Sequence, residues 1–485
     1  MRKLILMLTI VSLFVPSLFA YGQGENGSEE TPYEIIWYNI GTPQKDTEMV
    51  IGELNKYLVD KINATVKMTY FDWGEYNERM RVIIASGEPY DICFTCSWAN
   101  DYAQNVARNA FIPLDDLLVE HAQGTLNAVN PAFFSGVKRN GHLYAIPANK
   151  EMGWWGVWMF NADIVDKYNL DISNVHTLED LEPLLAIVKA GEDSDFVPIM
   201  GDRTFRPETP EFAAVFNNDY PFVIDFNDTD YKVKNKFETD VIRKHTETIR
   251  RYYKAGYFPK DVATLNNTEE LRKKKNWFVC GLHSQPYAEL QLARSWNTRL
   301  YYSQKYDPYV DNSSTQGSMM AVSVTSDRPD KAVQFLNLVN TDVYVRNLLG
   351  IGLENTHWEF VNEQKTKVKF LPQSQDYQVP GFTLQNMFIT YLFEDDPEDK
   401  WQKFEEFNNS CNDSPLLGFF FDITPVKTEL AAIQNVKEEF ERFIYTGTVD
   451  PQEYIAKYNK KLYEAGAQKV MDEMQMQINA WRAAQ

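Results

Sequence analysis

The stretch that decides the fold is YEIIWYNIGTPQKDTEMVIGELNKYLVDKINATVKMTYFDWGEYNERMRVIIASGEPYDICF, residues 33–94. In it, short β-rich runs alternate with segments whose apolar residues recur at helical spacing. The pattern predicts alternating strands and helices at residues 33–40, 46–61, 64–70, 73–85 and 90–94. Because such crossovers are right-handed and return to the same sheet, we expect a parallel sheet with helices covering its faces.

The carboxyl ends of these strands carry the first indication of a binding site. Ligands of parallel α/β sheets bind just beyond the carboxyl ends of the strands. Those ends lie at residues 39–42, 71–73 and 95–102, and two of the three contain tryptophan. We therefore expect a ligand to meet aromatic rings at this edge.

A second group of strands follows a loop-rich stretch. HLYAIP, residues 142–147, predicts a short strand closed by proline, and GWWGVWMF, residues 153–160, predicts another. Alternation places Trp154 and Trp158 on one face of the second strand and Trp155 on the other. These rings fit either a core strand or the wall of a cleft, and the pattern leaves both open.

In the rest of the chain, predicted helices and strands continue to alternate, and the C-terminal part is predicted to be helical. Helices are predicted at residues 178–190, 240–253 and 330–340, and a strand at 317–324. Near the C-terminus, Thr424 and Pro425 form a helix-start signal, Asp450 begins a capping box, and Gly466 separates the last two helices.

The composition excludes several classes of function. A length of 485 residues favours two or three domains. The formal charge of −20 argues against phosphate backbones and anionic membranes, so nucleic acid is not an expected partner. Aromatic residues make up 14% of the chain, which favours ring-stacking surfaces.

Residues 1–22 have the pattern of a cleaved secretory signal. Two basic residues precede an apolar run at residues 4–15, which is too short to span a bilayer, and cleavage is expected near Ala20. A lipoprotein would carry a cysteine directly after this run, but the first cysteine is Cys93. We therefore expect a periplasmic or extracellular protein without a lipid anchor.

The four cysteines do not form a recognisable functional motif. Cys93 and Cys96 form a CxxC pair, but Cys93 lies inside an apolar run, which favours buried thiols over a redox pair. Zinc would need two more ligands, and Cys280 and Cys411 do not have such spacing. A Cys93–Cys96 disulfide and a Cys280–Cys411 disulfide both remain open.

The motifs of common catalytic sites do not occur in the sequence. The six histidines stand alone, and the nucleophile-elbow, P-loop and dinucleotide-binding motifs are missing. Paired carboxylates could serve a glycosidase, but such pairs arise by chance among 68 acidic residues. We therefore expect no cofactor, no metal and no enzymatic activity.

Four blocks of the sequence resemble one known family. They are FDWGEYNERMRVIIASGEPYDICFTCSWANDYAQNVARNAFIPLDDLL at residues 71–118, GHLYAIP at 141–147, and the segments 326–357 and 418–481. The chain resembles the extracellular solute-binding proteins of bacterial ATP-binding-cassette importers, and more narrowly a LipO-like subgroup with a characteristic C-terminal extension. It departs from that subgroup in lacking the lipobox cysteine and in having Asn109 and Asn355 where glycine is common.

The resemblance implies a type II-like periplasmic-binding-protein fold, with two α/β lobes, hinge crossings and a helical C-terminal extension. Lobe 1 would comprise residues 30–147 and 318–360, and lobe 2 residues 148–317 and 361–485. The hinges would lie near residues 147–150 and 316–319, and the lobes would close on a ligand by hinge bending.

The resemblance also implies a function and its partners. The protein would be a monomer that captures a carbohydrate, more narrowly an oligosaccharide, and delivers it to a membrane permease. A peptide or another polar solute on the same fold is the alternative, followed by a secreted glycoside hydrolase and a sensor or adhesion module.

Physical chemistry then nominates the site residues. Sugars present apolar C–H faces and a belt of hydroxyls, so their pockets combine flat aromatic rings with polar side chains. The aromatic candidates are Trp73, Trp98, Tyr102, Trp154, Trp155, Trp277 and Trp358. The polar candidates are Asp72, Asn100, Asp101, Glu151 and Arg203. Each also has a structural explanation, such as a helix cap for Asp72 and a core position for Trp358.

Overall fold

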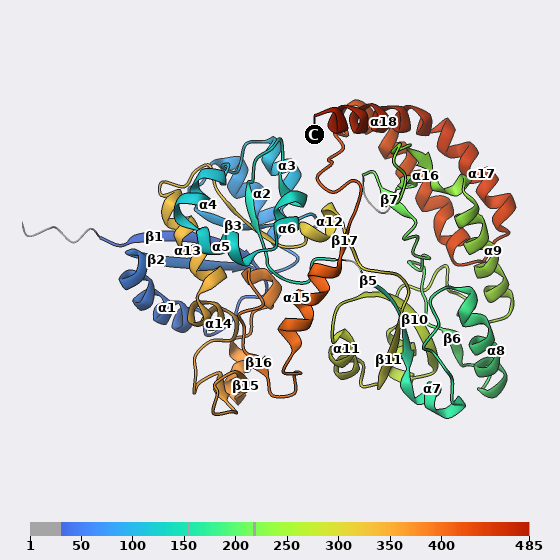
Figure 1. Ribbon diagram of the computed structural model, residues 1–485, viewed down its shortest axis with the longest axis horizontal. Coiled ribbons are helices and arrows are strands. Elements are labelled where there is room, and N and C mark those ends of the chain that lie inside the picture. Colours follow the sequence, from blue (N-terminus) through green and yellow to red (C-terminus); the bar gives the residue numbers. More distant parts are fainter. Residues whose placement is uncertain (1–30, 154, 217–219, 485) are drawn as a thin grey trace, which may run out of the picture.

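The computed structural model describes residues 31–153, 155–216 and 220–484. The elements form two lobes that lie side by side, with chain crossings between them and a helical layer on the second lobe (Figure 1). This agrees with the expected two-lobe α/β architecture. The predicted signal, residues 1–22, and the candidate Trp154 lie outside the described residues.

Lobe 1 is built on a five-stranded sheet in the order β2-β1-β3-β13-β4. Its strands are β1 (Tyr33–Ile40), β2 (Ala64–Phe71), β3 (Ile92–Thr95), β4 (Ala145–Pro147) and β13 (Met319–Val322). β1 runs parallel to β2 and β3, as predicted, whereas β13 runs antiparallel to β3 and β4. A strand from far along the chain therefore joins the sheet that residues 33–94 begin.

The helices of lobe 1 close its core. They are α1 (Thr47–Ile62), α2 (Tyr76–Ser86), α3 (Tyr102–Ala107), α4 (Asp115–His121), α5 (Gln123–Ala128), α6 (Pro131–Val137), α13 (Pro329–Thr341) and α14 (Val343–Ile351). α1 buries Val50, Leu54 and Leu58, which lie on one face because they are spaced by about one helical turn. In the same core Phe335 of α13 packs edge-on against Trp37 of β1, with ring centroids 5.5 Å apart.

Lobe 2 is built on a second sheet in the order β11-β5-β10-β6. Its elements are β5 (Trp155–Asn161), α7 (Ala162–Tyr168), α8 (Glu182–Gly191), β6 (Val197–Ile199), α9 (Asp240–Lys254), α10 (Glu269–Lys274), β10 (Trp277–Ser284), α11 (Ala288–Trp296) and β11 (Leu300–Gln304). β10 is antiparallel to β5 and parallel to β6. The predicted helix at 178–190 begins as a 3₁₀ turn, Glu179–Leu181, before α8.

A C-terminal layer packs on lobe 2. It consists of β7 (Phe212–Ala214), β8 (Phe222–Asp225), β9 (Lys234–Asn235), α16 (Lys427–Tyr445), α17 (Pro451–Glu464) and α18 (Ala467–Ala483), which share one hydrophobic core. Asp450 caps α17 by accepting the N–H groups of Gln452 and Glu453, as the sequence predicts. Thr424 and Pro425 instead form a 3₁₀ turn, and α16 begins at Lys427.

The segment after α14 corrects one expected boundary. It contains β14 (Trp358–Phe360), β15 (Lys367–Phe370), β16 (Leu392–Phe393) and α15 (Lys400–Ser410). Within it, Tyr377, Val379 and Leu384 are buried in the lobe 1 core, and the Tyr377 hydroxyl donates to the carbonyl of Leu349. The assignment of residues 361–384 to lobe 2 is therefore wrong, because apolar side chains of this part of the segment pack against lobe 1.

The structure explains the two asparagines that stand where glycine is common in the related subgroup. Asn109 and Asn355 have φ angles of 56° and 60°, in the left-handed region that favours glycine and that asparagine tolerates.

Cys93, Cys96, Cys280 and Cys411 are free thiols in the structure, so neither of the disulfides left open by the sequence is formed.

In the described part of the chain, three crossings connect the lobes: residues 148–153, residues 305–318 and residues 411–419. The second and third pair with each other through parallel strands β12 (Tyr309–Val310) and β17 (Asn412–Asp413). Asn312, in α12 (Asn312–Thr315), donates to the carbonyl of Phe419 and accepts the N–H of Gly418. Asn408 of α15 ties the first crossing down, since it donates to the carbonyl of Lys150 and accepts the N–H of Met152, both at 2.8 Å.

All three crossings meet at Gly153. A Cβ atom at this position would lie 2.3 Å from Sγ of Cys411 and 3.1 Å from the carbonyl oxygen of Tyr309. Contacts this short leave no room for a side chain, so glycine permits the close approach of the three segments. The crossings therefore form a packed joint rather than separate linkers.

We predict that Gly153→Ala destabilises the protein by about 1–3 kcal/mol, because the added methyl group overpacks the joint. Urea unfolding measures this loss. Combining it with Cys411→Ala, which removes the clashing sulfur, should recover part of the stability in a double-mutant cycle.

Gly52→Ala is the matched control, because nothing lies within 4 Å of a Cβ added there. Gly52 lies within α1, so the substitution should stabilise the protein by up to about 1 kcal/mol. Equal effects of the two glycine substitutions would contradict the packed joint.

Candidate functional site

Three aromatic side chains form an aromatic wall on lobe 1: Trp73, Trp98 and Phe382. The Trp73 and Trp98 rings stack with centroids 6.2 Å apart and planes 22° apart, and Phe382 lies 6.2 Å and 6.4 Å from them. Trp73 is 40% exposed and Trp98 is 49% exposed. Stacked rings that stay this exposed are typical of a surface that receives a ligand.

The fold holds this wall at the carboxyl ends of the lobe 1 strands. Trp73 follows β2, Trp98 follows β3, and both positions match the sequence prediction. The Trp98 indole N–H donates to the carbonyl of Gly317 at 2.8 Å, and the Ser318 hydroxyl donates to the carbonyl of Phe382. The wall is therefore attached to the crossing at residues 305–318.

Phe382 was missed because only tertiary structure brings it here. It lies in the 3₁₀ turn Gly381–Leu384, more than 280 residues after Trp98 along the chain. The turn follows a proline and carries no aromatic pattern that would mark it.

Three of the predicted residues beside the wall are structural in this conformation. Asn100 is buried, with φ of 46°, and its side chain donates to the carbonyl of Phe94. Asp101 caps α3 through the N–H of Gln104. Tyr102 is fully buried, and its hydroxyl donates to the carbonyl of Val137, so its predicted stacking role is wrong.

Two acidic candidates do lie on accessible surface near the wall. Asp72 is exposed next to Trp73, and its carboxylate accepts the N–H of Gly74. Glu151 lies on the first crossing and pairs with Lys150, Oε1 to Nζ, at 2.6 Å. Lys150 in turn lies against Gly317, the residue that holds Trp98.

The remaining candidates lie apart from the aromatic wall. Trp277 is fully buried and packs edge-on against Trp296, and Trp358 is 5% exposed with its N–H donated to the carbonyl of Gly352. Their predicted ligand roles are wrong, because both are core residues. Trp155 packs against Tyr302 and Phe407, and Arg203 is exposed in the loop after β6.

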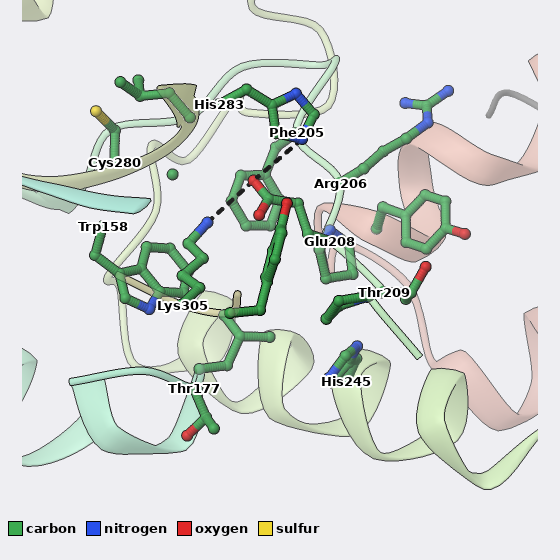
Figure 2. Close-up of a pocket in the computed structure, with 18 of the residues that line it drawn as sticks. Trp158, Thr177, Phe205, Arg206, Glu208, Thr209, His245, Cys280, His283 and Lys305 are labelled. Atoms are coloured by element: carbon green, nitrogen blue, oxygen red, sulfur yellow. Dashed lines mark hydrogen bonds and ion pairs between the residues drawn. The ribbon is translucent and has the colours of Figure 1, made fainter. Parts of the chain in front are cut away.

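Lobe 2 contains a cavity of about 770 Å³ that the sequence did not indicate; we call it the lobe 2 cavity. It lies between the lobe 2 sheet, at the carboxyl ends of β6 and β10, and the C-terminal layer. Figure 2 shows Lys305 and Glu208 meeting at its centre, with His283 on the far side of Glu208. Its lining residues are spread along the chain from Trp158 to Tyr445, so no local pattern could reveal it.

The centre of the cavity is an ion pair packed on an aromatic ring. Lys305 Nζ lies 3.1 Å from Glu208 Oε1 and 3.8 Å from the centroid of Trp158. Burial lowers the pKa of the Lys305 amine, and the Glu208 carboxylate opposes this shift. His283 Nε2 lies 4.0 Å from the same carboxylate oxygen, and burial lowers its pKa.

The site offers hydrogen-bond donors, acceptors and rings. Among the described residues, no group of three or more His, Cys, Asp or Glu side chains could hold a metal ion. No helix within the described ranges is long and apolar enough to cross a bilayer. The arrangement suits non-covalent binding of a molecule with both polar and apolar faces.

Burial of His245, on the cavity side of α9, predicts a pH effect on stability. Burial lowers the pKa of this imidazole in the folded protein below its ordinary value of 6.5. Below that pH the unfolded chain binds a proton that the folded protein does not, so stability is lost on acidification. We predict that His245→Phe removes this loss, and that its unfolding free energy falls less steeply below pH 6.5, by at most about 1.4 kcal/mol per pH unit.

Urea unfolding at several pH values between 8 and 5 measures the difference. Above pH 7 the two slopes should coincide, because the imidazole is neutral in both states. A steeper acid loss in the variant would show that the imidazole is charged in the folded protein.

Comparison with known proteins agrees with this geometry. Residues 54–352 match the family model described as bacterial extracellular solute-binding protein, and residues 415–483 match a domain of unknown function, DUF3502. A carbohydrate ABC transporter substrate-binding protein from Streptococcus pneumoniae serotype 4 is 32% identical over 92% of this chain and 90% of its own length.

Solved structures extend the similarity to three dimensions. The crystal structure of the N-glycan transport solute binding protein NgtS from Streptococcus pneumoniae is 31% identical, covers 92% of this chain and 98% of its own, and superposes with a TM-score of 0.84. For NgtS in complex with Man1GlcNAc, with the same coverage and identity, the TM-score is 0.72. The chain therefore belongs to the family of bacterial extracellular solute-binding proteins.

Proposed function

We propose that this protein captures an oligosaccharide between its two lobes and delivers it, unaltered, to the membrane permease of an ATP-binding-cassette importer. The observation that carries the proposal is the exposed, stacked pair Trp73 and Trp98 at the carboxyl ends of the lobe 1 strands. The protein would act outside the cytoplasmic membrane as a monomer, after removal of residues 1–22.

The aromatic wall suits a sugar because each pyranose ring has an apolar face of C–H groups. Such a face packs on an indole ring, while the hydroxyl belt needs polar partners at the edge. Lys150 and Glu151 supply a donor and an acceptor beside the wall.

The joint between the lobes supports capture by closure. The TM-score with NgtS falls from 0.84 to 0.72 and 0.69 when NgtS is in complex with Man1GlcNAc and Man5GlcNAc. The relative arrangement of the lobes in this chain is therefore closer to that in the NgtS structure whose description names no sugar. Bending at the three crossings would bring lobe 2 toward the aromatic wall.

The relatives also indicate the class of ligand. NgtS is described as an N-glycan transport protein and was solved with two mannose- and N-acetylglucosamine-containing oligosaccharides. With 31% identity across nearly the whole chain, we propose ligands of the same chemical class for this protein.

We predict that Man5GlcNAc stabilises the protein against thermal unfolding. A ligand at a hundred times its dissociation constant adds about 2.7 kcal/mol, because it binds only the folded state. Differential scanning calorimetry measures the shift, and mass spectrometry of the recovered sugar tests for cleavage. Recovery of a cleaved sugar would show that the protein is an enzyme and not a binding protein. A thermal shift with peptides but not with sugars would favour a peptide as the ligand.

We predict that Trp98→Ala weakens Man5GlcNAc binding at least tenfold, or about 1.4 kcal/mol, because the stacking surface is lost. Isothermal titration calorimetry measures the affinity. Tyr344→Ala is the control, since this 42% exposed ring lies on α14 and contacts Tyr57 rather than the wall. Unchanged affinity in Trp98→Ala would reject the wall as the sugar-binding surface.

A further inference from the structure

We infer that the lobe 2 cavity is a second carbohydrate subsite, that it accepts an uncharged sugar residue, and that the C-terminal domain of unknown function contributes Tyr445 to its lining. The inference rests on the proposed function and specifies where the second part of an oligosaccharide binds. It also gives the C-terminal domain a role in ligand binding.

The position of the cavity favours one ligand reaching both places. Lys305, Tyr306 and Tyr309 line it, and all three lie on the crossing whose Gly317 carbonyl holds Trp98. Gly317 lies only eight positions after Tyr309 along the chain. A volume of about 770 Å³ is within the range of small-molecule sites, which is enough for sugar residues.

The charges around the cavity cancel, although the whole chain carries −20. Four acidic side chains line it: Glu179, Asp202, Glu208 and Glu211. Four basic side chains line it as well: Arg206, Lys236, Lys244 and Lys305. Burial keeps the imidazoles of His245 and His283 neutral near pH 7, because it lowers the pKa of each. A balanced lining favours an uncharged ligand over a uronic acid or a cation.

Two polar atoms in the cavity are buried without a hydrogen-bond partner among the described residues. They are Oε2 of Glu208 and Nδ1 of His245. Buried polar atoms of folded proteins nearly always have partners, so each unpaired atom calls for one from outside the chain. A sugar hydroxyl serves both, because it donates to a carboxylate and either donates to or accepts from an imidazole nitrogen.

The C-terminal domain contacts the cavity through Tyr445 of α16, which the cavity loop reaches through Arg206. Tyr445 lines the cavity, and the Arg206 guanidinium lies 5.6 Å from the centroid of its ring. Arg206 Nη2 lies 3.5 Å from Oε2 of Glu441, whose other oxygen accepts the Tyr458 hydroxyl. Figure 2 shows Arg206 extending from the cavity loop toward this helix. Glu441, Tyr445 and Tyr458 all belong to the matched domain at residues 415–483.

Three substitutions test the subsite with Man5GlcNAc as the probe, measured by isothermal titration calorimetry on the full chain. His245→Phe, Glu208→Gln and Arg206→Ala should each lower the affinity at least fivefold. His245→Phe separates ligand binding from folding, because the Nδ1 atom that it removes has no hydrogen-bond partner among the described residues. Its thermal midpoint without sugar should therefore be unchanged or higher.

Matched controls make the same chemical changes away from the cavity. Glu439→Gln removes a carboxylate that pairs with Lys461 on the surface of α16 and α17, and Arg442→Ala removes an arginine that lies over Phe443. Both should bind Man5GlcNAc like the unsubstituted protein. Equal losses in variants and controls would overturn the subsite.

The outcomes separate this inference from the proposed function. If Trp98→Ala weakens binding while the cavity variants do not, the oligosaccharide binds but the cavity is not a subsite. If no sugar binds the unsubstituted protein, both proposals fail. An oligomannuronate of matched length tests the charge argument, because binding as tight as that of Man5GlcNAc would overturn the preference for an uncharged ligand.

Discussion

The close approach of three chain segments at Gly153 is the constraint on which the rest of the structure depends. Cys411 and Tyr309 contact this glycine from the other two crossings, and the Asn312 and Asn408 side chains fix the segments around it. Because the first two crossings carry Lys150, Glu151 and Lys305 of the candidate sites, the packing of this joint sets how the lobes face each other. A joint this tightly packed favours discrete open and closed arrangements over continuous flexing.

The two candidate binding surfaces are complementary in chemistry. The aromatic wall of lobe 1 is exposed and apolar, and it suits the C–H face of a sugar. The lobe 2 cavity combines polar and apolar side chains, with a central Lys305–Glu208 pair and charges that cancel. An oligosaccharide needs both, since affinity comes from ring stacking and orientation from hydrogen bonds to hydroxyls. The net negative charge of the chain therefore lies outside the cavity lining, and there it disfavours the binding of anionic partners.

The C-terminal domain connects fold and site in a way that its helical sequence does not suggest. Its helices share a core with β7 and β8 and with Val233 and Phe237 on either side of β9, all from the middle of the chain. By packing there, the domain holds the loop that carries Arg206 and Glu208 against the lobe 2 sheet. Helix–strand packing that looks purely structural therefore also positions polar groups of the cavity.

The sequence by itself determined the parallel unit at residues 33–94, the terminal helices, the family and the strand-end positions of Trp73 and Trp98. These follow from local periodicity, capping residues and the rule that strand ends form the ligand edge. Tertiary structure alone decided that Tyr102, Trp277 and Trp358 are core residues, that Phe382 joins the wall, and that residues 377–384 pack on lobe 1. It also made the lobe 2 cavity, whose residues are far apart along the chain. The physical reason is that burial and long-range contacts depend on how elements pack, whereas periodicity reports only which face of an element is apolar.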